Sequence, residues 1–105
     1  SRQDKLSYTI SKSALQGLVA SLSVDLGKNG MLINAVLPGV IDTPMTLNNL
    51  KEDQIKSIIS NTPLKSLASL EDISNTVGFL CSKSNQGISG QFICVDKGFS
   101  NAKII

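Results

Sequence analysis

Hydrophobic residues recur every three or four positions between Ser7 and Leu26, and this spacing is typical of one apolar face of a helix. Gly27 and then Asn29-Gly30 follow, so we expect the helix to end there. A second set of small or apolar residues falls largely outside this face: Ala14, Gly17, Ala20, Ser21 and Val24. Because a surface helix usually has a single apolar face, the pattern predicts a helix that is packed on two sides.

Two short and mostly apolar runs, Met31–Leu37 and Gln91–Val95, show no clean alternation of apolar and polar residues. Strands of parallel sheets that helices cover on both faces have this composition, so we expect two buried strands. Asn34 is the polar exception in the first run, and it must hydrogen-bond, most simply to neighbouring backbone. Pro38-Gly39 and Asp96-Lys97-Gly98 are expected to end the two strands.

The segment between the two runs contains two further helical patterns. Val40–Asn49 has no regular period and is predicted to be a loop or a short irregular stretch, whereas Lys51–Ser60 has isoleucines at helical spacing. Ser69 precedes two acidic residues, which predicts the N-cap of a helix that ends near Ser82. Phe99–Ile105 is expected to be a tail. The order of elements predicts an α/β parallel crossover, and two strands alone leave such a sheet incomplete.

Composition narrows the possible functions. Of 105 residues, 41% are hydrophobic and 17% charged, which suits one packed domain or part of one. The net charge of +2 provides no strong basic field, so neither nucleic acid nor a membrane surface is expected as a partner. The chain has no histidine, which excludes histidine triads and histidine-ligated metals, and we expect no metal site.

Cys81 and Cys94 lie thirteen positions apart, a spacing that matches neither CxxC nor a zinc finger. We expect two reduced, buried thiols in a cytoplasmic protein, with a disulfide or a nucleophilic thiol as alternatives. The apolar runs are too short to span a membrane, and the polar start at Ser1 is unlike a signal peptide. The missing initiator Met fits processing and equally fits a chain cut from a longer protein.

Tyr8 and Lys12 are the strongest candidates for catalytic residues. They are four residues apart at the start of the first predicted helix, so both side chains lie on one face. A phenol titrates near pH ~10, and a neighbouring ammonium stabilises its phenolate and lowers that pKa. Such a pair suits a tyrosine that gives a proton to a carbonyl or takes one from an alcohol. This spacing is also common on helix surfaces, so the motif alone is a weak signal.

Three further motifs follow the YxxxK motif in order: Ile33–Thr43 (INAVLPGVIDT), Ile88–Gln91 (ISGQ) and Val95–Gly98 (VDKG). Together they resemble the C-terminal part of the short-chain dehydrogenase/reductase family, over nearly the whole chain. The resemblance implies that Tyr8 is the general acid/base and that Lys12 lowers its pKa and binds the nicotinamide ribose. Both residues would thus be catalytic and contact the cofactor, and Ser11 also matches a common family choice.

The resemblance also implies a cofactor-binding turn after the first strand. Pro38, Gly39 and Val40 would line the nicotinamide ring, while Ile41 and Thr43 would hold its carboxamide. Ligands bind open parallel sheets at the carboxyl ends of strands, and a glycine there allows a close approach. An ordinary strand-ending turn is the alternative. The stretch from Pro44 to Asn61 matches the mobile loop over the substrate in this family, and Lys97 stands where glycine is usual.

The fold class implied is α/β: the C-terminal portion of a Rossmann-type doubly wound parallel sheet, with residues 1–105 forming part of one dinucleotide-binding oxidoreductase domain. The glycine-rich phosphate loop and the catalytic Ser and Asn of the family have no counterpart in this chain, so the chain alone is expected to be inactive. The implied enzyme transfers hydride between NAD or NADP and a small carbonyl or alcohol substrate. A cytoplasmic homotetramer or homodimer is expected.

Two alternatives remain. Sugar-nucleotide epimerases and dehydratases share YxxxK, but they carry a long substrate domain after the sheet, and only a few residues follow Gly98 here. A non-catalytic assembly subunit of the same fold is the second alternative, and cofactor titration would separate it from an enzyme.

Overall fold

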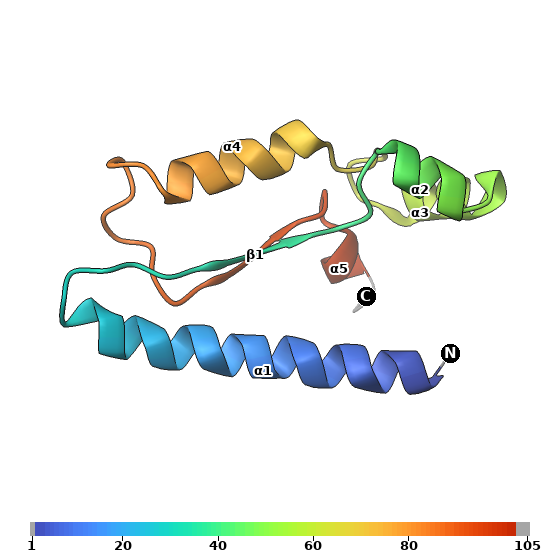
Figure 1. Ribbon diagram of the computed structural model, residues 1–105. Helices are drawn as coiled ribbons and strands as arrows, with labels where there is room; N and C mark the ends of the chain where they lie inside the picture. The colour runs from blue at the N-terminus through green and yellow to red at the C-terminus, as the bar shows by residue number, and fades with distance from the viewer. Residues whose placement is uncertain (1, 103–105) are drawn as a thin grey trace. The chain divides into compact units, whose positions relative to one another are not determined.

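The computed structural model describes residues 2–102 and contains five helices and two strands within that range. Strands β1 (Ala35–Pro38) and β2 (Phe92–Val95) pair directly in a two-stranded parallel sheet (Figure 1). The helices are α1 (Arg2–Gly27), α2 (Pro44–Asn49), α3 (Glu52–Asn61), α4 (Leu70–Leu80) and α5 (Phe99–Ala102). The last three residues of the predicted tail lie outside the described residues.

The chain divides into two compact units. The first contains the chain up to Ala35 together with Lys83–Ile93, and the second contains Val36–Ser82 together with the segment from Cys94 onward. Each strand contributes residues to both units.

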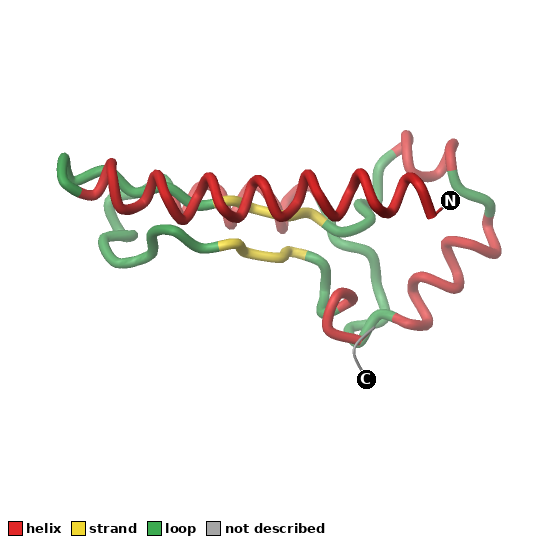
Figure 2. The backbone as a smooth tube through the Cα atoms, turned by 90° about the horizontal axis from the view of Figure 1, so that it is seen from below, coloured by secondary structure: helices red, strands yellow, loops and turns green. Residues whose placement is uncertain are grey.

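In the first unit, α1 runs without interruption and ends where the sequence predicts (Figure 2). The N–H of Met31 donates to the carbonyl of Leu26 at 3.2 Å, and Gly30 takes the left-handed φ of 73° that allows the chain to turn. The prediction of a helix over Ser7–Leu26 is confirmed, and the helix extends further toward the N-terminus than the apolar pattern indicates.

Asn34 hydrogen-bonds to backbone, as its position in an apolar run predicts. Its Nδ2 donates to the carbonyl of Ile88 at 2.9 Å, and its Oδ1 accepts from the N–H of Gln91 at 3.0 Å. Just before it, the N–H of Ile33 donates to Ser89 Oγ at 3.1 Å. These side-chain bonds act beside backbone bonds from Gly90 N–H to the Ile33 carbonyl at 2.6 Å and from Ala35 N–H to the Gln91 carbonyl at 2.9 Å. The strand itself starts at Ala35, and not at Met31 as predicted.

The predicted burial of the strands is wrong for the part of the chain that the structure describes. Every residue of β1 and β2 is half-buried or exposed. The predicted burial of the thiols is wrong too: Cys81 and Cys94 are free, as expected, but both are exposed. The physical reason is that two strands with few helices do not supply enough side chains to cover both faces of the sheet.

In the second unit, α3 and α4 confirm the predicted helices, whereas α2 contradicts the predicted loop over Val40–Asn49. Pro44 begins α2, because proline at the first helical position loses no intrahelical hydrogen bond. The predicted Ser69 cap is confirmed: Ser69 Oγ accepts from the N–H of Asp72 at 3.0 Å, and Asp72 Oδ2 accepts from the N–H of Ser69 at 2.9 Å. The predicted tail begins with the short helix α5.

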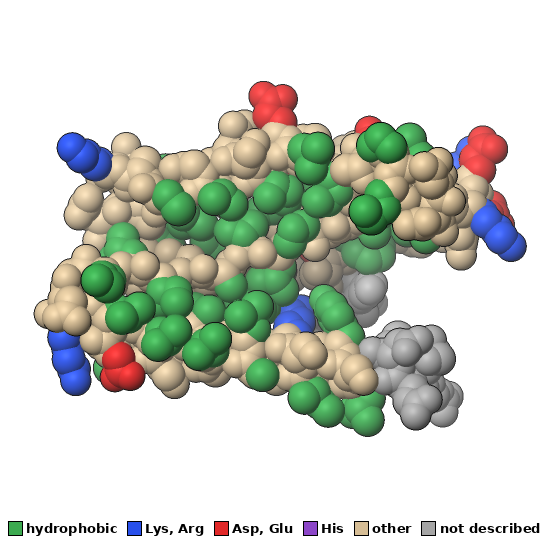
Figure 3. Space-filling model, viewed as in Figure 1, with side chains coloured by type: hydrophobic (Ala, Val, Ile, Leu, Met, Phe, Trp, Pro, Cys, Tyr) green, Lys and Arg blue, Asp and Glu red, His purple; other side chains and the backbone are tan. Residues whose placement is uncertain are grey.

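Apolar side chains remain widely exposed in both units. Among the described residues, the only buried hydrophobic side chains are those of Val19 and Ala68. On the face seen in Figure 3, hydrophobic side chains reach the surface over α1 and also over α4. The large hydrophobic residues that are exposed include Leu15, Leu18 and Val24 in α1 and Leu70, Val77 and Phe79 in α4. No helix in residues 2–102 is long and apolar enough to cross a membrane.

Candidate active site and cofactor hollow

Tyr8 and Lys12 lie four residues apart within α1, so they share one face of this helix as predicted. Tyr8 is 63% exposed, and Lys12 is half-buried. The Tyr8 phenol can therefore reach a small molecule in solvent. Lys12 lies one helical turn away from Tyr8.

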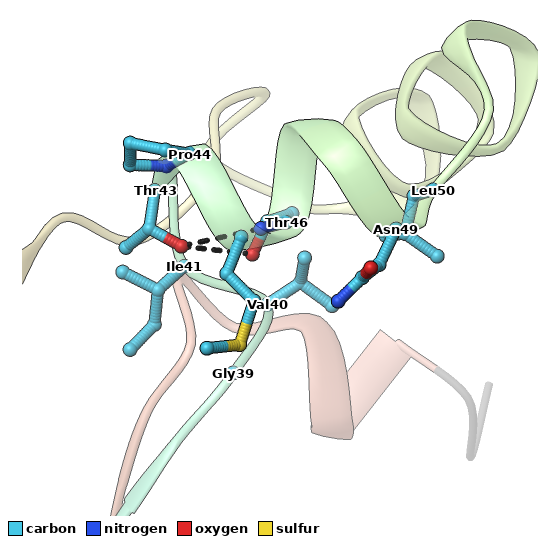
Figure 4. A pocket seen from close by; sticks show the side chains of 9 residues that line it. Gly39, Val40, Ile41, Thr43, Pro44, Thr46, Asn49 and Leu50 are labelled. Atoms are coloured by element: carbon cyan, nitrogen blue, oxygen red, sulfur yellow. Dashed lines mark hydrogen bonds between the residues drawn. The ribbon is translucent and has the colours of Figure 1, made fainter.

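The segment that follows β1 lines a hollow of about 640 Å³ (Figure 4). Four predicted cofactor-binding residues line it: Gly39, Val40, Ile41 and Thr43. Pro38, the fifth predicted residue of this segment, is exposed at the end of β1 and is not part of the lining. Small-molecule sites typically measure about 300–1,000 Å³ and are mostly apolar with a few polar groups, so the hollow has a suitable size and lining.

Thr43 supplies one of the polar groups that line the hollow, and it also starts α2. As the N-cap, its Oγ1 accepts from the N–H of Thr46 at 3.3 Å and lies 3.2 Å from Thr46 Oγ1 (Figure 4). Thr46 can donate its hydroxyl proton to Thr43, which leaves the Thr43 proton for a ligand acceptor. The helix cap thus fixes the position of a donor at the hollow.

Ile41 and Asp42 hold this segment against the chain before α4. Ile41 forms an isolated parallel bridge with Ala68, and the N–H of Asp42 donates to the carbonyl of Ala68 at 2.9 Å. Ala68 is one of the two buried hydrophobic residues of the described chain. The lining of the hollow is therefore anchored by backbone bonds on one side.

Gly39 is needed for a close approach that the sequence does not reveal. A Cβ atom added there would lie 2.7 Å from Asp96 Cβ and 3.1 Å from Asp96 Cα. The N–H of Gly39 also donates to the carbonyl of Val95 at 3.1 Å. Glycine is therefore required here for packing against the turn after β2, whether or not a flat ring approaches its other side.

Asp96 organises that turn through its carboxylate. Its Oδ1 accepts from the N–H of Gly98 and its Oδ2 from the N–H of Ser100, each at 3.0 Å. Partial burial acts to raise the pKa of Asp96, but the hydrogen bonds from Ser100 and Gly98 outweigh it and hold the pKa below the ordinary value of 3.8.

The sequence analysis missed several residues that line the hollow: Met45, Thr46, Asn49 and Leu50, with Pro44. All of them belong to α2 or follow it directly, and the sequence predicted a loop there. The pair Thr43-Pro44 was the available signal, because threonine followed by proline is typical of a helix start. No group of three or more metal-ligating side chains occurs within the described residues.

Comparisons with known proteins assign the chain to a family. A family model described as Enoyl-(Acyl carrier protein) reductase matches residues 2–100. A solved structure of a short chain dehydrogenase family protein from Francisella tularensis superposes with a TM-score of 0.78 at 30% identity, over 90% of this chain and 43% of that one. The chain belongs to the short-chain dehydrogenase/reductase family.

Other members of the family show the same likeness. A hydroxysteroid dehydrogenase structure from Escherichia coli has a TM-score of 0.83 at 32% identity, over 89% of this chain and 39% of that one. A 3-oxoacyl-(acyl-carrier-protein) reductase of Rickettsia felis is 40% identical over 87% of this chain and 37% of its own length. A tropinone reductase homologue of Arabidopsis thaliana is 36% identical over 89% of this chain and 31% of its own length.

These matches confirm the predicted fold class, which is part of a Rossmann-type α/β fold. The chain spans about a third of the length of the curated relatives that it matches.

Proposed function

We propose that the chain is the C-terminal part of an NAD(P)-dependent oxidoreductase that acts on a small carbonyl or alcohol substrate. The observation that carries this proposal is the Tyr8–Lys12 pair on one face of α1, in a chain that belongs to this family. In the direction of reduction, the carbonyl carbon accepts hydride and the carbonyl oxygen accepts the Tyr8 proton. Lys12 stabilises the phenolate that remains.

The hollow after β1 fits the nicotinamide end of such a cofactor. Its apolar lining suits a flat ring, and the Thr43 hydroxyl can donate to a carboxamide oxygen. When bound, the cofactor supplies or takes up the hydride. We assign Gly39, Val40, Ile41 and Thr43 to ring and carboxamide binding, with Pro38 at the edge. Lys12 and Tyr8 are assigned to the nicotinamide ribose.

Tyr8→Phe in the intact enzyme tests the catalytic role. Loss of a general acid should lower kcat at least ~100-fold, while the phenyl ring keeps the fold intact. Steady-state kinetics with NADH or NADPH and a panel of ketones gives the rate, and a thermal melt checks the fold. Ser7→Ala, which removes a neighbouring exposed hydroxyl, is the matched control and should change kcat less than twofold. A Tyr8→Phe enzyme within a few-fold of the wild-type kcat would rule out the assignment.

The 105-residue chain alone should not bind NAD(H) or NADP(H) measurably. No GxxxGxG sequence occurs in it, and that loop with its helix N-terminus is what holds the pyrophosphate in Rossmann folds. Isothermal titration calorimetry measures this directly. Micromolar binding to the chain alone would contradict the proposal that residues outside this chain hold the pyrophosphate of the cofactor.

We further propose that the intact protein is a cytoplasmic homotetramer or homodimer. The wide exposure of apolar side chains on α1 supports an assembly, because contiguous exposed apolar surface marks interaction sites. Two free and exposed cysteines support a reducing compartment, since exposed thiols oxidise outside one.

A further inference from the structure

Lys97 has a backbone conformation that lysine rarely adopts. Within residues 2–102, only Lys65 and Lys97 have positive φ values without being glycine, at 56° and 59°. Left-handed backbone brings the Cβ of an L-residue too close to the following carbonyl oxygen, whereas glycine has no such penalty. Lys97 must therefore be held in place by other interactions.

The side chain of Lys97 provides one such interaction. Its Nζ lies 3.5 Å from Asp72 Oδ2, and the two side chains are 29% and 36% exposed. The other described pair of similar length, Lys56–Glu52, is 75% and 86% exposed. Because solvent and salt screen a half-buried pair less than an exposed pair, the Lys97–Asp72 pair is the stronger constraint.

Asp72 is itself held by hydrogen bonds, so the ion pair connects the turn after β2 to the start of α4. Its Oδ2 accepts from the N–H of Ser69 in the reciprocal cap of α4. The carbonyl of Lys97 accepts from the N–H of Leu64 at 3.4 Å, and a Cβ on Gly98 would lie 3.1 Å from Pro63 Cγ. The turn after β2 is thus held against α4 and the segment before it.

The same turn packs against the hollow. Asp96 lies beside Gly39 so closely that no Cβ fits between them, and Gly39 lines the hollow. A displacement of residues 96–98 would therefore shift Gly39.

We propose that Lys97 and Asp72 are positioning residues, which hold the strained turn after β2 and thereby keep Gly39 in place at the cofactor hollow. This inference rests on the proposed function for its effect on cofactor binding. Neither side chain needs to touch the cofactor. The ion pair compensates for a lysine at a position where glycine would take the same backbone conformation unaided.

We call the Lys97–Asp72 ion pair, in its role of holding Gly39 in place, the clamp. Four variants of the intact enzyme test it, with backbone amide hydrogen exchange at Gly39 as the readout. Lys97→Met keeps the strain and removes the charge, while Lys97→Gly removes both. Asp72→Asn removes the charge but keeps an oxygen that caps Ser69, and Lys56→Met removes the exposed pair as a control. Exchange at Gly39 requires no cofactor, so it also reports when the enzyme binds none.

Exchange at Gly39 should accelerate about threefold in Lys97→Met and in Asp72→Asn, the effect of losing one half-buried pair. It should stay within about twofold of wild type in Lys97→Gly and in Lys56→Met. The Kd for NADH or NADPH should rise in Lys97→Met and in Asp72→Asn and stay close to the wild-type value in Lys97→Gly and in Lys56→Met. The KM for the carbonyl substrate should be unchanged in all four variants.

Rescue by glycine is the decisive result. If Lys97→Gly exchanges as fast as Lys97→Met, or if neither differs from wild type, the clamp is refuted. A wild-type enzyme that binds neither NADH nor NADPH refutes the proposed function, and the exchange pattern at Gly39 still decides the clamp. If Lys97→Met fails to fold, Asp72→Asn gives the same comparison with the lysine in place.

Discussion

Gly39 makes a close contact that can be seen only in the folded chain. From the sequence, its place after a strand indicates that a ligand approaches closely. The structure adds the neighbouring turn, because a Cβ would lie 2.7 Å from Asp96 Cβ. The sequence could predict the need of Asn34 for hydrogen bonds, since a polar residue in an apolar run always has that need. It could not predict the contact between Gly39 and Asp96, which join segments far apart in the chain.

Gly39→Ala should therefore destabilise the protein before any effect on a cofactor is considered. Overpacking of this kind typically costs about 1–3 kcal/mol, because the turn at Asp96 must move. Gly78→Ala is the matched control: nothing lies within 4 Å of its added Cβ, and alanine in a helix interior should stabilise by about 0.5–1 kcal/mol. Urea unfolding of both variants measures the free energies, and a Gly39→Ala protein as stable as wild type would contradict the close approach.

At the scale of elements, helices with local signals were predictable and strand limits were not. Isoleucine spacing located α3, and the Ser69 cap located the start of α4, because both signals lie within a few residues. Helix α2 was missed because Val40–Asn49 has no regular apolar period, although Pro44 at the first helical position begins the helix. The limits of strand β1 depend on its pairing with β2, a distant segment that no local pattern encodes.

The cap of α4 should make stability depend on acid. Hydrogen bonds from the Ser69 backbone and hydroxyl, with Lys97 nearby, hold the pKa of Asp72 below the ordinary value of 3.8. A carboxyl with a lowered folded pKa contributes stability above 3.8 and loses it as the pH falls through the lower folded value. Urea unfolding between pH 7 and pH 3 should show a smaller loss in Asp72→Asn than in wild type. Equal losses would mean that Asp72 is not preferentially ionised in the folded state.

At the scale of the whole molecule, the sequence indicated an incomplete α/β sheet, and membership of the family confirms the fold class. The extent of exposure was not predictable, because burial depends on which elements lie around each face. Val19 and Ala68 are the only hydrophobic side chains buried within the described residues, and leucines of α1 such as Leu15 and Leu18 stay exposed. A chain with this surface lowers its free energy by covering it.

The isolated 105-residue chain should therefore not persist as a monomer. Multi-angle light scattering should give a mass well above 11.1 kDa, or the protein should aggregate, because unpaired strand edges and apolar helix faces associate. Co-expression with the segment that precedes the tyrosine in relatives should restore a defined assembly. A cooperatively folding monomer of 11.1 kDa would contradict both the need for a covering surface and the assembly proposed for the intact protein.

The hydrogen bonds of Asn34 have a consequence for synthesis on the ribosome. Its two partners lie 54 and 57 residues further along the chain, and α2, α3 and α4 are made in between. Closing so long a loop is slow, and it cannot begin until Gln91 has left the exit tunnel. During that interval β1 has emerged without its partner strand β2, and an unpaired strand edge in a nascent chain favours aggregation.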